Sequence, residues 1–355
     1  MEKLCPDILT IITTYHCTAE CEECCFECSP KLKSRLSLGQ IEDFMDEAKE
    51  LFGNQIKGVV FTGGECFTLG EDLIRAVDKA HSLGYSTRCV SNGYWARTMM
   101  TARKKLMELK DAGLDELNIS TGDNHQQWIS FESVLNAIEV SSELGINSLI
   151  VVEGFEESKF KMADIVNNIR FRKIKEKQVL GYNKGNIGVL NNIWIPMHEE
   201  AKITQKEDYY ITEERALKSE GCNNILTTLG LNPYGKIIDC CGLTMEHIPE
   251  MKLGTYEKGN LEYIFNKQFN DFMKIWLWVE GPFKILYYAL RKDKNIKINK
   301  KLTHPCQACV EIFSNSEIKN TLKTNYQDVV EDVMFKYAIK LKKYKLDKQT
   351  SFVYQ

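Results

Sequence analysis

The stretch Cys17-Thr-Ala-Glu-Cys21-Glu-Glu-Cys24 contains three cysteines that are separated by three and then by two residues. Three thiolates at this spacing can bind three irons of a 4Fe–4S cube from one short loop. Because such clusters usually have four cysteine ligands, a three-cysteine site leaves one iron open to a substrate or cofactor. The alternative interpretation is a zinc site, since zinc sites also use Cys-x2-Cys.

The composition is that of a soluble globular protein. The 355 residues are enough for one large α/β domain with an appendage, or for two domains. Hydrophobic residues make up 43% and charged residues 27% of the chain, as in typical globular domains, and a net charge of −3 gives no indication of a nucleic-acid partner. The thirteen cysteines fall mostly into three groups, which favours metal ligation over disulfides. Because Met1–Asp7 leads directly into an apolar run without signal-peptide features, we expect a cytoplasmic protein.

Strand-like runs alternate with helical patterns in the first half of the chain, which predicts parallel βαβ units. The predicted strands are Ile8–Thr13, Val59–Thr62, Tyr85–Val90, Glu116–Ser120, Ile146–Val152 and a sixth near Asn192–Pro196. The predicted helices are Ser37–Phe52, Glu71–Leu83, Thr98–Ala112, Phe131–Leu144 and a segment around Lys159–Arg170. Six units are too few for a closed eightfold barrel, so we predict an α/β fold with a partial (β/α)6 TIM-like barrel over residues 1–205.

The rest of the chain is expected to form a second, smaller part. Residues 206–318 carry the later cysteines on turn-rich structure, and within them Asn266–Lys292 is aromatic with helical spacing. The Gly281-Pro282 pair and the internal charges of this segment argue against a membrane span. A buried helical hairpin and a peptide-binding wall are the two interpretations of it. Residues 319–355 predict a lysine-rich C-terminal helix and tail with a solvated face.

Polar and glycine residues follow the predicted strands at their carboxyl ends. Gly63-Gly64-Glu65 follows the second strand, Ser91-Asn92 the third and Ser120 the fourth. In a parallel barrel these ends line one mouth, where active sites lie. The glycines allow close backbone approach, and the glutamate can accept a charge-assisted hydrogen bond. Strand-end capping is the alternative role for the serines and the asparagine, and for His125 an ordinary loop histidine is favoured over a catalytic base.

The cysteine loop, followed in this order by Gly63-Gly64-Glu65, resembles the radical S-adenosylmethionine (SAM) superfamily. The resemblance implies that Cys17, Cys21 and Cys24 hold a 4Fe–4S cluster whose open iron binds SAM. It also implies that the Gly-Gly-Glu motif receives the methionine ammonium of SAM. Glu23 departs from the pattern, because the residue before the third cysteine is usually aromatic in this superfamily. The contacts with the rest of SAM are therefore assigned to Phe26 for the adenine and to Ser91, Asn92 and Ser120 for the ribose and carboxylate.

The later cysteines form a second motif, Cys222-x12-Gly235-x4-Cys240 followed by Cys306-x2-Cys309. A β-hairpin from Leu229 to Cys240, turning at Asn232–Gly235, would bring the first two of these cysteines together. The motif is similar to the twitch form of the SPASM auxiliary-cluster domain. This similarity implies one auxiliary 4Fe–4S cluster, and not two, with Cys222, Cys240, Cys306 and Cys309 as ligands. A zinc ribbon is the alternative for this site taken alone.

Cys241 directly follows a predicted cluster ligand. Neighbouring side chains of a strand point to opposite faces, so if Cys240 faces the cluster, Cys241 faces elsewhere. A thiol can donate a hydrogen atom to a carbon radical, and a buried core cysteine is the alternative. The chain resembles, more specifically, the radical-SAM epimerases of ribosomally made peptides, with matching pieces such as Cys24-Cys25-Phe26 and Asp239-Cys240-Cys241. That resemblance implies that Cys240 is the ligand and Cys241 the hydrogen donor.

The resemblance implies an isomerase that converts L-residues of a ribosomally synthesised precursor peptide to D-residues. A one-electron reductant such as flavodoxin or ferredoxin would be its second partner. Two enzymatic alternatives remain: a peptide maturase that forms thioether or carbon–carbon cross-links, and a twitch-type radical dehydrogenase of a small molecule. A non-enzymatic iron–sulfur carrier or a zinc-stabilised binding module does not explain a three-cysteine site together with Gly63-Gly64-Glu65.

Overall fold

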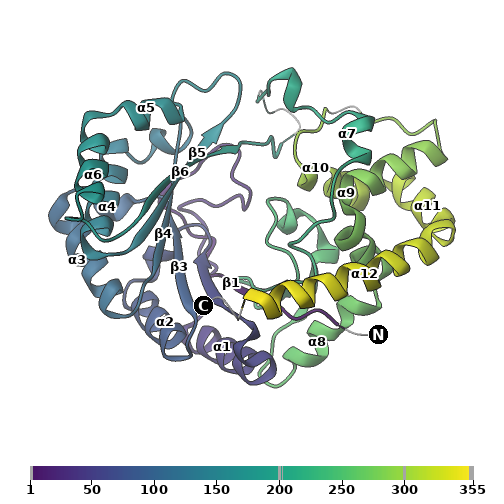
Figure 1. Cartoon of the computed structure of the whole chain (residues 1–355), viewed down its shortest axis with the longest axis horizontal. Coiled ribbons are helices and arrows are strands. Elements are labelled where there is room, and N and C mark those ends of the chain that lie inside the picture. Colours follow the sequence, from purple (N-terminus) through teal and green to yellow (C-terminus); the bar gives the residue numbers. More distant parts are fainter. Residues whose placement is uncertain (1–2, 199–200, 202, 299–300, 352–355) are drawn as a thin grey trace.

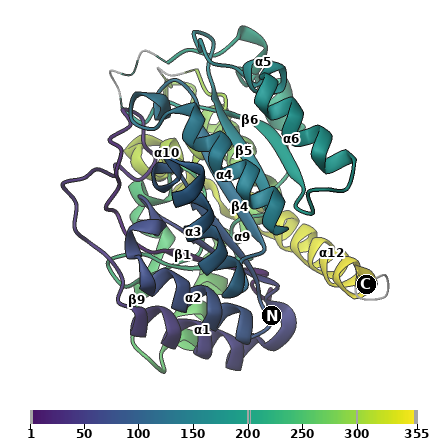
Figure 2. The same cartoon turned by 90° about the vertical axis from the view of Figure 1, so that its left-hand side faces the viewer.

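One nine-stranded sheet organises the molecule. The computed structural model describes residues 3–198, 201, 203–298 and 301–351, and the strand order within them is β6-β5-β4-β3-β2-β1-β7-β8-β9. The first six strands are parallel, each paired with the next along the chain, and they curve around a concave face while the helices cover the outer face (Figures 1 and 2). The predicted partial barrel is therefore confirmed.

The bounds of most elements agree with the sequence pattern. The six strands are β1 (Ile8–Ile12), β2 (Gly58–Thr62), β3 (Ser86–Ser91), β4 (Glu116–Thr121), β5 (Asn147–Gly154) and β6 (Ile187–Ile193). The helices that follow them are α1 (Leu38–Phe52), α2 (Glu71–Ser82), α3 (Met99–Asp111), α4 (Phe131–Leu144), α5 (Met162–Asn167) and α6 (Ile169–Val179). Local signals fix several ends: Ser37 caps α1 by accepting a hydrogen bond from the Gln40 backbone N–H, and Gly145 ends α4 in a left-handed conformation.

Two predicted elements differ from the structure. β6 lies at Ile187–Ile193, earlier than the predicted strand near Asn192–Pro196. As an edge strand with a single fully buried side chain, that of Ile187, it lacks the apolar alternation of the other strands. The helix predicted around Lys159–Arg170 corresponds to α5, and most of α6 was not predicted. α6 begins separately because the Asn168 side chain accepts hydrogen bonds from the N–H groups of Arg170 and Phe171.

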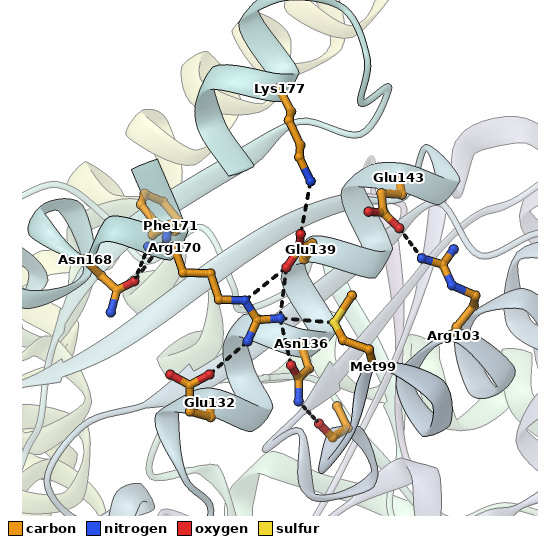
Figure 3. Close-up of polar contacts among 11 residues, drawn as sticks. Met99, Arg103, Glu132, Asn136, Glu139, Glu143, Asn168, Arg170, Phe171 and Lys177 are labelled. Atoms are coloured by element: carbon orange, nitrogen blue, oxygen red, sulfur yellow. Dashed lines mark hydrogen bonds and ion pairs between the residues drawn. The ribbon is translucent and has the colours of Figure 1, made fainter. Parts of the chain in front are cut away.

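One arginine fastens α6 to α4 (Figure 3). Arg170 donates from Nε to Glu139 at 3.0 Å and from Nη1 to Glu132 at 2.8 Å. Its Nη2 donates to Asn136 Oδ1 at 2.8 Å, and Asn136 in turn donates to the carbonyl of Ala96 at 2.9 Å. These contacts hold the last crossover helix, and with it β6, against the body of the barrel.

The sheet buries one face and leaves the other half-covered. Phe61, Cys89 and Leu117, which point to the helices, are fully buried. Their neighbours along the strands, such as Val60 and Arg88, point to the concave face and are only half-buried. This alternation at every second residue is expected where one face of a sheet is packed and the other is not. The concave face of the barrel is therefore accessible.

The C-terminal part continues the same sheet. β7 (Thr228–Leu231) runs parallel beside β1, β8 (Lys236–Ile238) returns antiparallel to it, and β9 (Lys252–Thr255) pairs with β8. The predicted hairpin and its turn are confirmed, with Gly235 in the left-handed conformation at φ 69°. Because β7 pairs with β1, the sheet runs without a break across the boundary expected at residue 205. The division into residues 1–205, 206–318 and 319–355 stays a prediction.

The C-terminal helices gather around α9 (Phe272–Lys292), on the green-to-yellow side of Figure 1. They are α7 (Glu213–Leu217), α10 (Pro305–Ser314), α11 (Ser316–Asn325) and α12 (Gln327–Ser351), whereas α8 (Leu261–Lys267) packs against α1, β8 and β9. α9 kinks at Gly281, just before Pro282. Trp276 and Trp278 are fully buried, so the aromatic segment is a buried, kinked helix and not an exposed wall. None of the helices among the described residues combines the length and hydropathy that crossing a bilayer requires.

Candidate active site

A cavity of about 300 Å³, the first cavity, lies at the mouth of the partial barrel between the cysteine loop and the carboxyl ends of the strands. Positions as far apart in sequence as Cys17 and Ser120 meet there, as expected where parallel strands end at one edge. Most residues predicted to bind the cluster or SAM line it, namely Cys17, Cys21, Cys24, Phe26, Gly63, Gly64, Ser91, Asn92 and Ser120.

Hydrogen bonds shape the cysteine loop. The backbone N–H of Cys24 donates to the carbonyl of Cys21 at 3.2 Å. From the end of β3, the Asn92 side chain donates to Thr18 Oγ1 at 3.1 Å and lies 3.6 Å from Cys17 Sγ. Asn92 therefore ties the loop to the strand ends.

The three thiols differ in acidity. Burial raises the pKa of Cys17 to about 11 and that of Cys21 to about 12. A hydrogen bond from the Cys28 side chain lowers the pKa of Cys24 to about 6. Cys24 is therefore the thiol that gives up its proton most readily. This matters because metals bind the deprotonated thiolate.

Gly63 and Gly64 stand where two chain segments touch. A Cβ atom at Gly63 would lie 2.4 Å from the carbonyl oxygen of Thr14, and one at Gly64 would lie 2.3 Å from that of His16. The N–H of Gly64 donates to the Thr14 carbonyl at 2.7 Å. The glycines are therefore required for the end of β2 to approach the chain that enters the cysteine loop.

Glu65 is not among the residues that line the first cavity. Its carboxylate is fully buried and accepts hydrogen bonds from Ser91 Oγ at 3.0 Å, from the Asn92 backbone N–H at 2.8 Å and from the Phe67 backbone N–H at 3.1 Å. Burial raises the pKa of Glu65 to about 7, although these hydrogen bonds act in the opposite direction. The glutamate thus joins the ends of β2 and β3, and its predicted contact with the SAM ammonium stays a prediction.

Four further residues line the first cavity that the motifs did not identify as site residues. His125 Nδ1 lies 3.0 Å from the buried carboxylate of Glu153, which also accepts a hydrogen bond from a backbone N–H. Asn118 Oδ1 and Trp194 Nε1 are buried without a hydrogen-bond partner in the described structure. Unpaired polar atoms are costly unless a ligand completes them, so this wall suits a ligand with polar groups. The alternation along β4 was the available signal for Asn118, which shares the concave-facing positions with Ser120.

Glu23, the departure from the superfamily pattern, has a structural role. Its buried carboxylate accepts hydrogen bonds from the backbone N–H groups of Met197 and His198. It therefore ties the cysteine loop to the segment that follows β6, which also carries Trp194. Phe26, the predicted adenine contact, lines the cavity and packs against Tyr15 with ring centroids 6.2 Å apart.

A second cavity of about 250 Å³ lies among the later cysteines, and Cys222, Cys240, Cys306 and Cys309 all line it. The backbone N–H of Gly242 donates to Cys240 Sγ at 3.2 Å, and a Cβ at Gly242 would lie 3.0 Å from Cys306 Sγ. Only a glycine leaves the space between these sulfurs free. Apolar side chains such as Met245, Ile248 and Met251 and an equal number of polar side chains complete the lining of the cavity.

Helix α9 collects these four cysteines from separate segments. The N–H of Cys222 donates to the carbonyl of Leu277 at 2.9 Å. Lys274, also on α9, forms a fully buried ion pair with Asp239, the residue before Cys240. α10 carries Cys306 and Cys309 and packs against α9. One helix therefore contacts every element that contributes a cysteine.

Cys241 lies apart from its neighbour Cys240. Its Sγ is 3.7 Å from Thr228 Oγ1 on β7, and it also interacts with Thr10 on β1. Thr10 is paired with Val60, which is on the concave face. The side chain is exposed, yet the surrounding protein raises the pKa of its thiol by burial. The contacts with Thr228 and Thr10 place the Cys241 side chain on the concave side of the sheet.

The two donor sets suit the groups that the resemblance implies. The first cavity offers thiols on one side and unpaired polar atoms on the other, as a cluster with an adjoining polar ligand requires. The second offers four thiols around a volume. Among the described residues, no three His, Cys, Asp or Glu side chains converge on one ion. In a 4Fe–4S site each cysteine binds a different iron, so thiols need only surround the cluster.

Comparisons with known proteins agree with this architecture. Residues 11–167 match the model of the Radical SAM superfamily. YydG of Bacillus subtilis (strain 168), whose name assigns it to peptide biosynthesis, is 22% identical over 247 residues, which cover 60% of this chain and 77% of that protein. The structure of native anSMEcpe with bound AdoMet and the Cp18Cys peptide is similar with a TM-score of 0.52 at 12% identity, over 93% of this chain and 100% of that chain. The similarity to anSMEcpe shows a shared fold.

Proposed function

Because residues 11–167 are a radical SAM domain, we propose that this protein converts L-residues of a ribosomally made peptide to D-residues. Cys17, Cys21 and Cys24 hold the SAM-binding 4Fe–4S cluster in this proposal. When bound, the cluster and SAM supply a 5′-deoxyadenosyl radical that takes a hydrogen atom from the Cα of the peptide. Cys241 then returns the hydrogen atom of its thiol to the opposite face of that carbon.

The observation that carries the proposal is the separation of Cys240 from Cys241. Cys240 lines the second cavity, while Cys241 lies against Thr228 on the concave side of the sheet. A structural core cysteine would have no need of an accessible thiol on that side. A hydrogen donor needs such a thiol, because a peptide can reach it only from the open face.

Hydrogen transfer from Cys241 leaves a sulfur radical, which must be converted back to a thiol before the next turnover. One C–H bond of the peptide is broken and one is formed, while the S–H bond of Cys241 is broken. One electron and one proton regenerate the thiol, and a second electron is consumed when SAM is cleaved to methionine and the 5′-deoxyadenosyl radical. Both electrons come ultimately from a one-electron reductant of the flavodoxin or ferredoxin class. We assign an auxiliary 4Fe–4S cluster to Cys222, Cys240, Cys306 and Cys309, next to Cys241.

The remaining site residues bind SAM in this proposal. Gly63 and Gly64 present backbone groups to its methionine part, with Glu65 behind them. Ser91, Asn92 and Ser120 contact the ribose and carboxylate, and Phe26 contacts the adenine. The unpaired Asn118 Oδ1 and Trp194 Nε1 in the same cavity support a polar ligand of this kind.

A peptide substrate is supported by three observations. The concave face is half-covered along several strands, so an extended chain can lie on it. YydG is named for peptide biosynthesis. The anSMEcpe structure, which shares the fold, contains a bound peptide beside AdoMet.

The test uses anaerobically reconstituted enzyme, reductant, SAM and a peptide encoded beside its gene, all in heavy water. We expect the peptide to gain one solvent deuterium at Cα for each modified residue, read by mass spectrometry. A product lighter by two hydrogens would favour a cross-linking maturase or a dehydrogenase instead. SAM cleavage without any change in the peptide would point to a small-molecule substrate.

A further inference from the structure

We infer that the C-terminal helix α12 supplies Lys340 as a positively charged neighbour of Cys222, which makes the auxiliary cluster easier to reduce. The inference rests on the proposed function, because it requires a cluster in the second cavity. It gives a role to a helix that lies outside the cysteine motifs. Lys340 acts here through the cluster environment, so it is a positioning and tuning residue and not a catalytic one.

α12 is seated on one aromatic side chain of α9. Trp278 is fully buried, and its ring makes edge contacts with Tyr337 and Tyr344 of α12, with centroids 5.4 Å and 6.3 Å apart. Lys340 lies between these tyrosines on the same face of the helix, with its Nζ 4.6 Å from the centroid of the Trp278 ring. α12 crosses α9 in the lower right of Figure 1, where the two helices pack together. The packing of Tyr337 and Tyr344 against Trp278 therefore fixes the position of Lys340 between them.

The ammonium of Lys340 lies at the turn that carries Cys222. Its Nζ donates to the Trp278 carbonyl at 2.5 Å. The neighbouring carbonyl, that of Leu277, accepts the N–H of Cys222. A Cβ atom at Gly221 would lie only 2.7 Å from Lys340 Nζ and 1.9 Å from the Trp278 carbonyl oxygen. The absence of a side chain at Gly221 is thus what allows the cation to reach this turn.

The positive charge of Lys340 is expected to stabilise negative charge at Cys222. The Lys340 ammonium lies at the turn that carries Cys222, so its positive charge attracts a thiolate at that position. The interaction is reciprocal, so the ammonium stabilises negative charge on the sulfur and on any cluster attached to it. A cluster gains one negative charge on reduction. A half-buried cation at one ligand therefore raises the reduction potential, since charge and solvent exposure near a cluster set that potential.

The experiment measures the potential of the auxiliary cluster alone. The background is the full chain with Cys17, Cys21 and Cys24 changed to Ala, which keeps only the second cysteine set. In this background Lys340→Met, Lys340→Arg and Lys343→Met are titrated anaerobically, with electron paramagnetic resonance as the readout. Lys343 is an exposed lysine of the same helix, so its replacement controls for net charge.

We expect Lys340→Met to disfavour reduction about tenfold, which corresponds to a potential about 59 mV lower for one electron. Lys340→Arg keeps the charge and should leave most of the potential in place, and Lys343→Met should not change it. Equal potentials in all four proteins, or equal shifts for Lys340→Met and Lys343→Met, would overturn the inference. If the background protein binds no cluster, the auxiliary-cluster part of the proposed function fails, and this inference falls with it.

Discussion

The two cysteine cavities are assembled in opposite ways. The first takes its three thiols from one loop, Cys17 to Cys24, and its other walls from strand ends. The second takes four thiols from separate segments between Cys222 and Cys309, all of which contact α9. A short motif can therefore specify the first site almost locally, whereas the second exists only once the C-terminal helices have packed.

The cavities also differ in what surrounds the thiols. The first contains unpaired polar atoms of Asn118 and Trp194 and opens toward the concave face. The second is lined by polar and apolar side chains in equal number, and Gly242 keeps the space between its sulfurs free. Among the described residues, no polar side-chain atom of its lining is buried without a partner. Unpaired polar atoms suit a ligand that binds and leaves, as SAM does, whereas thiols around a space without such atoms suit a group that stays. In the proposed function the reaction therefore belongs to the first cavity and the auxiliary cluster to the second.

The largest expected effect comes from removing a ligand of the first cavity. Cys17→Ala should abolish SAM cleavage, because the loop then offers too few thiolates to hold a cluster with an open iron. The second cavity should keep its own iron, which an iron assay would measure together with 5′-deoxyadenosine formation. SAM cleavage at the wild-type rate in this variant would break the assignment of reaction to the first cavity.

Breaking the ion pair under the second cavity should affect mainly stability. Lys274→Met leaves the buried Asp239 carboxylate without its partner and should lower the free energy of unfolding by about 3–5 kcal/mol. Denaturant titration would measure this, and the added change Asp239→Asn should restore part of the loss. Lys292→Met, which removes an exposed ion pair with Asp328 from the same helix, is the control and should leave stability nearly unchanged.

Glu65 should make the stability of the first region depend on pH. Its folded-state pKa of about 7 lies above the ordinary 4.5, so between these values the folded state binds a proton that the unfolded state does not. The contribution is therefore largest below pH 4.5 and is lost as the pH rises through 7, by about 3 kcal/mol in total. Glu65→Gln should flatten the unfolding free energy between pH 5.5 and 8, measured by denaturant titration. An unchanged slope in this variant would show that another group titrates.

A smaller effect is expected from Glu23, which supports one wall of the first cavity without lining it. Glu23→Ala removes the buried acceptor for the Met197 and His198 N–H groups, which should loosen the segment that carries Trp194. We expect the KM for SAM to rise about three- to tenfold, because hydrogen bonds to charged groups contribute about 1.5–3 kcal/mol, with little change in kcat. Glu22→Ala, at the exposed neighbouring position, should not change either constant. Equal effects of the two variants would mean that only loop charge matters.

The sequence predicted the elements whose residues lie close together in the chain. β1 to β5 follow from apolar alternation, and the Cys17–Cys24 loop follows from spacing alone. β6 was misplaced because, as an edge strand, it buries only Ile187. Most of α6 was not predicted, because the capping hydrogen bonds of Asn168 that start this helix depend on where α5 ends.

Apart from Asn118, which the alternation along β4 could have indicated, the site features that the sequence did not predict depend on contacts across the fold. Glu153 and Trp194 come from different elements and meet His125 only in three dimensions. The burial of Glu65 depends on Ser91 and Asn92, which are 26 and 27 residues away. The position of Lys340 beside Cys222 depends on the packing of α12 on α9. A sequence pattern cannot predict such contacts, because they form only in the folded chain.

The central claim is that adjacent cysteines serve different sites, and a matched pair of variants tests it directly. Cys240→Ala and Cys241→Ala are reconstituted side by side, and their iron content and solvent deuterium in the peptide are measured. We predict that Cys240→Ala loses about four of about eight irons. Cys241→Ala should keep its iron and its SAM cleavage and lose deuterium incorporation at Cα. Solvent deuterium at Cα in the Cys241→Ala product, at the wild-type level, would contradict the account.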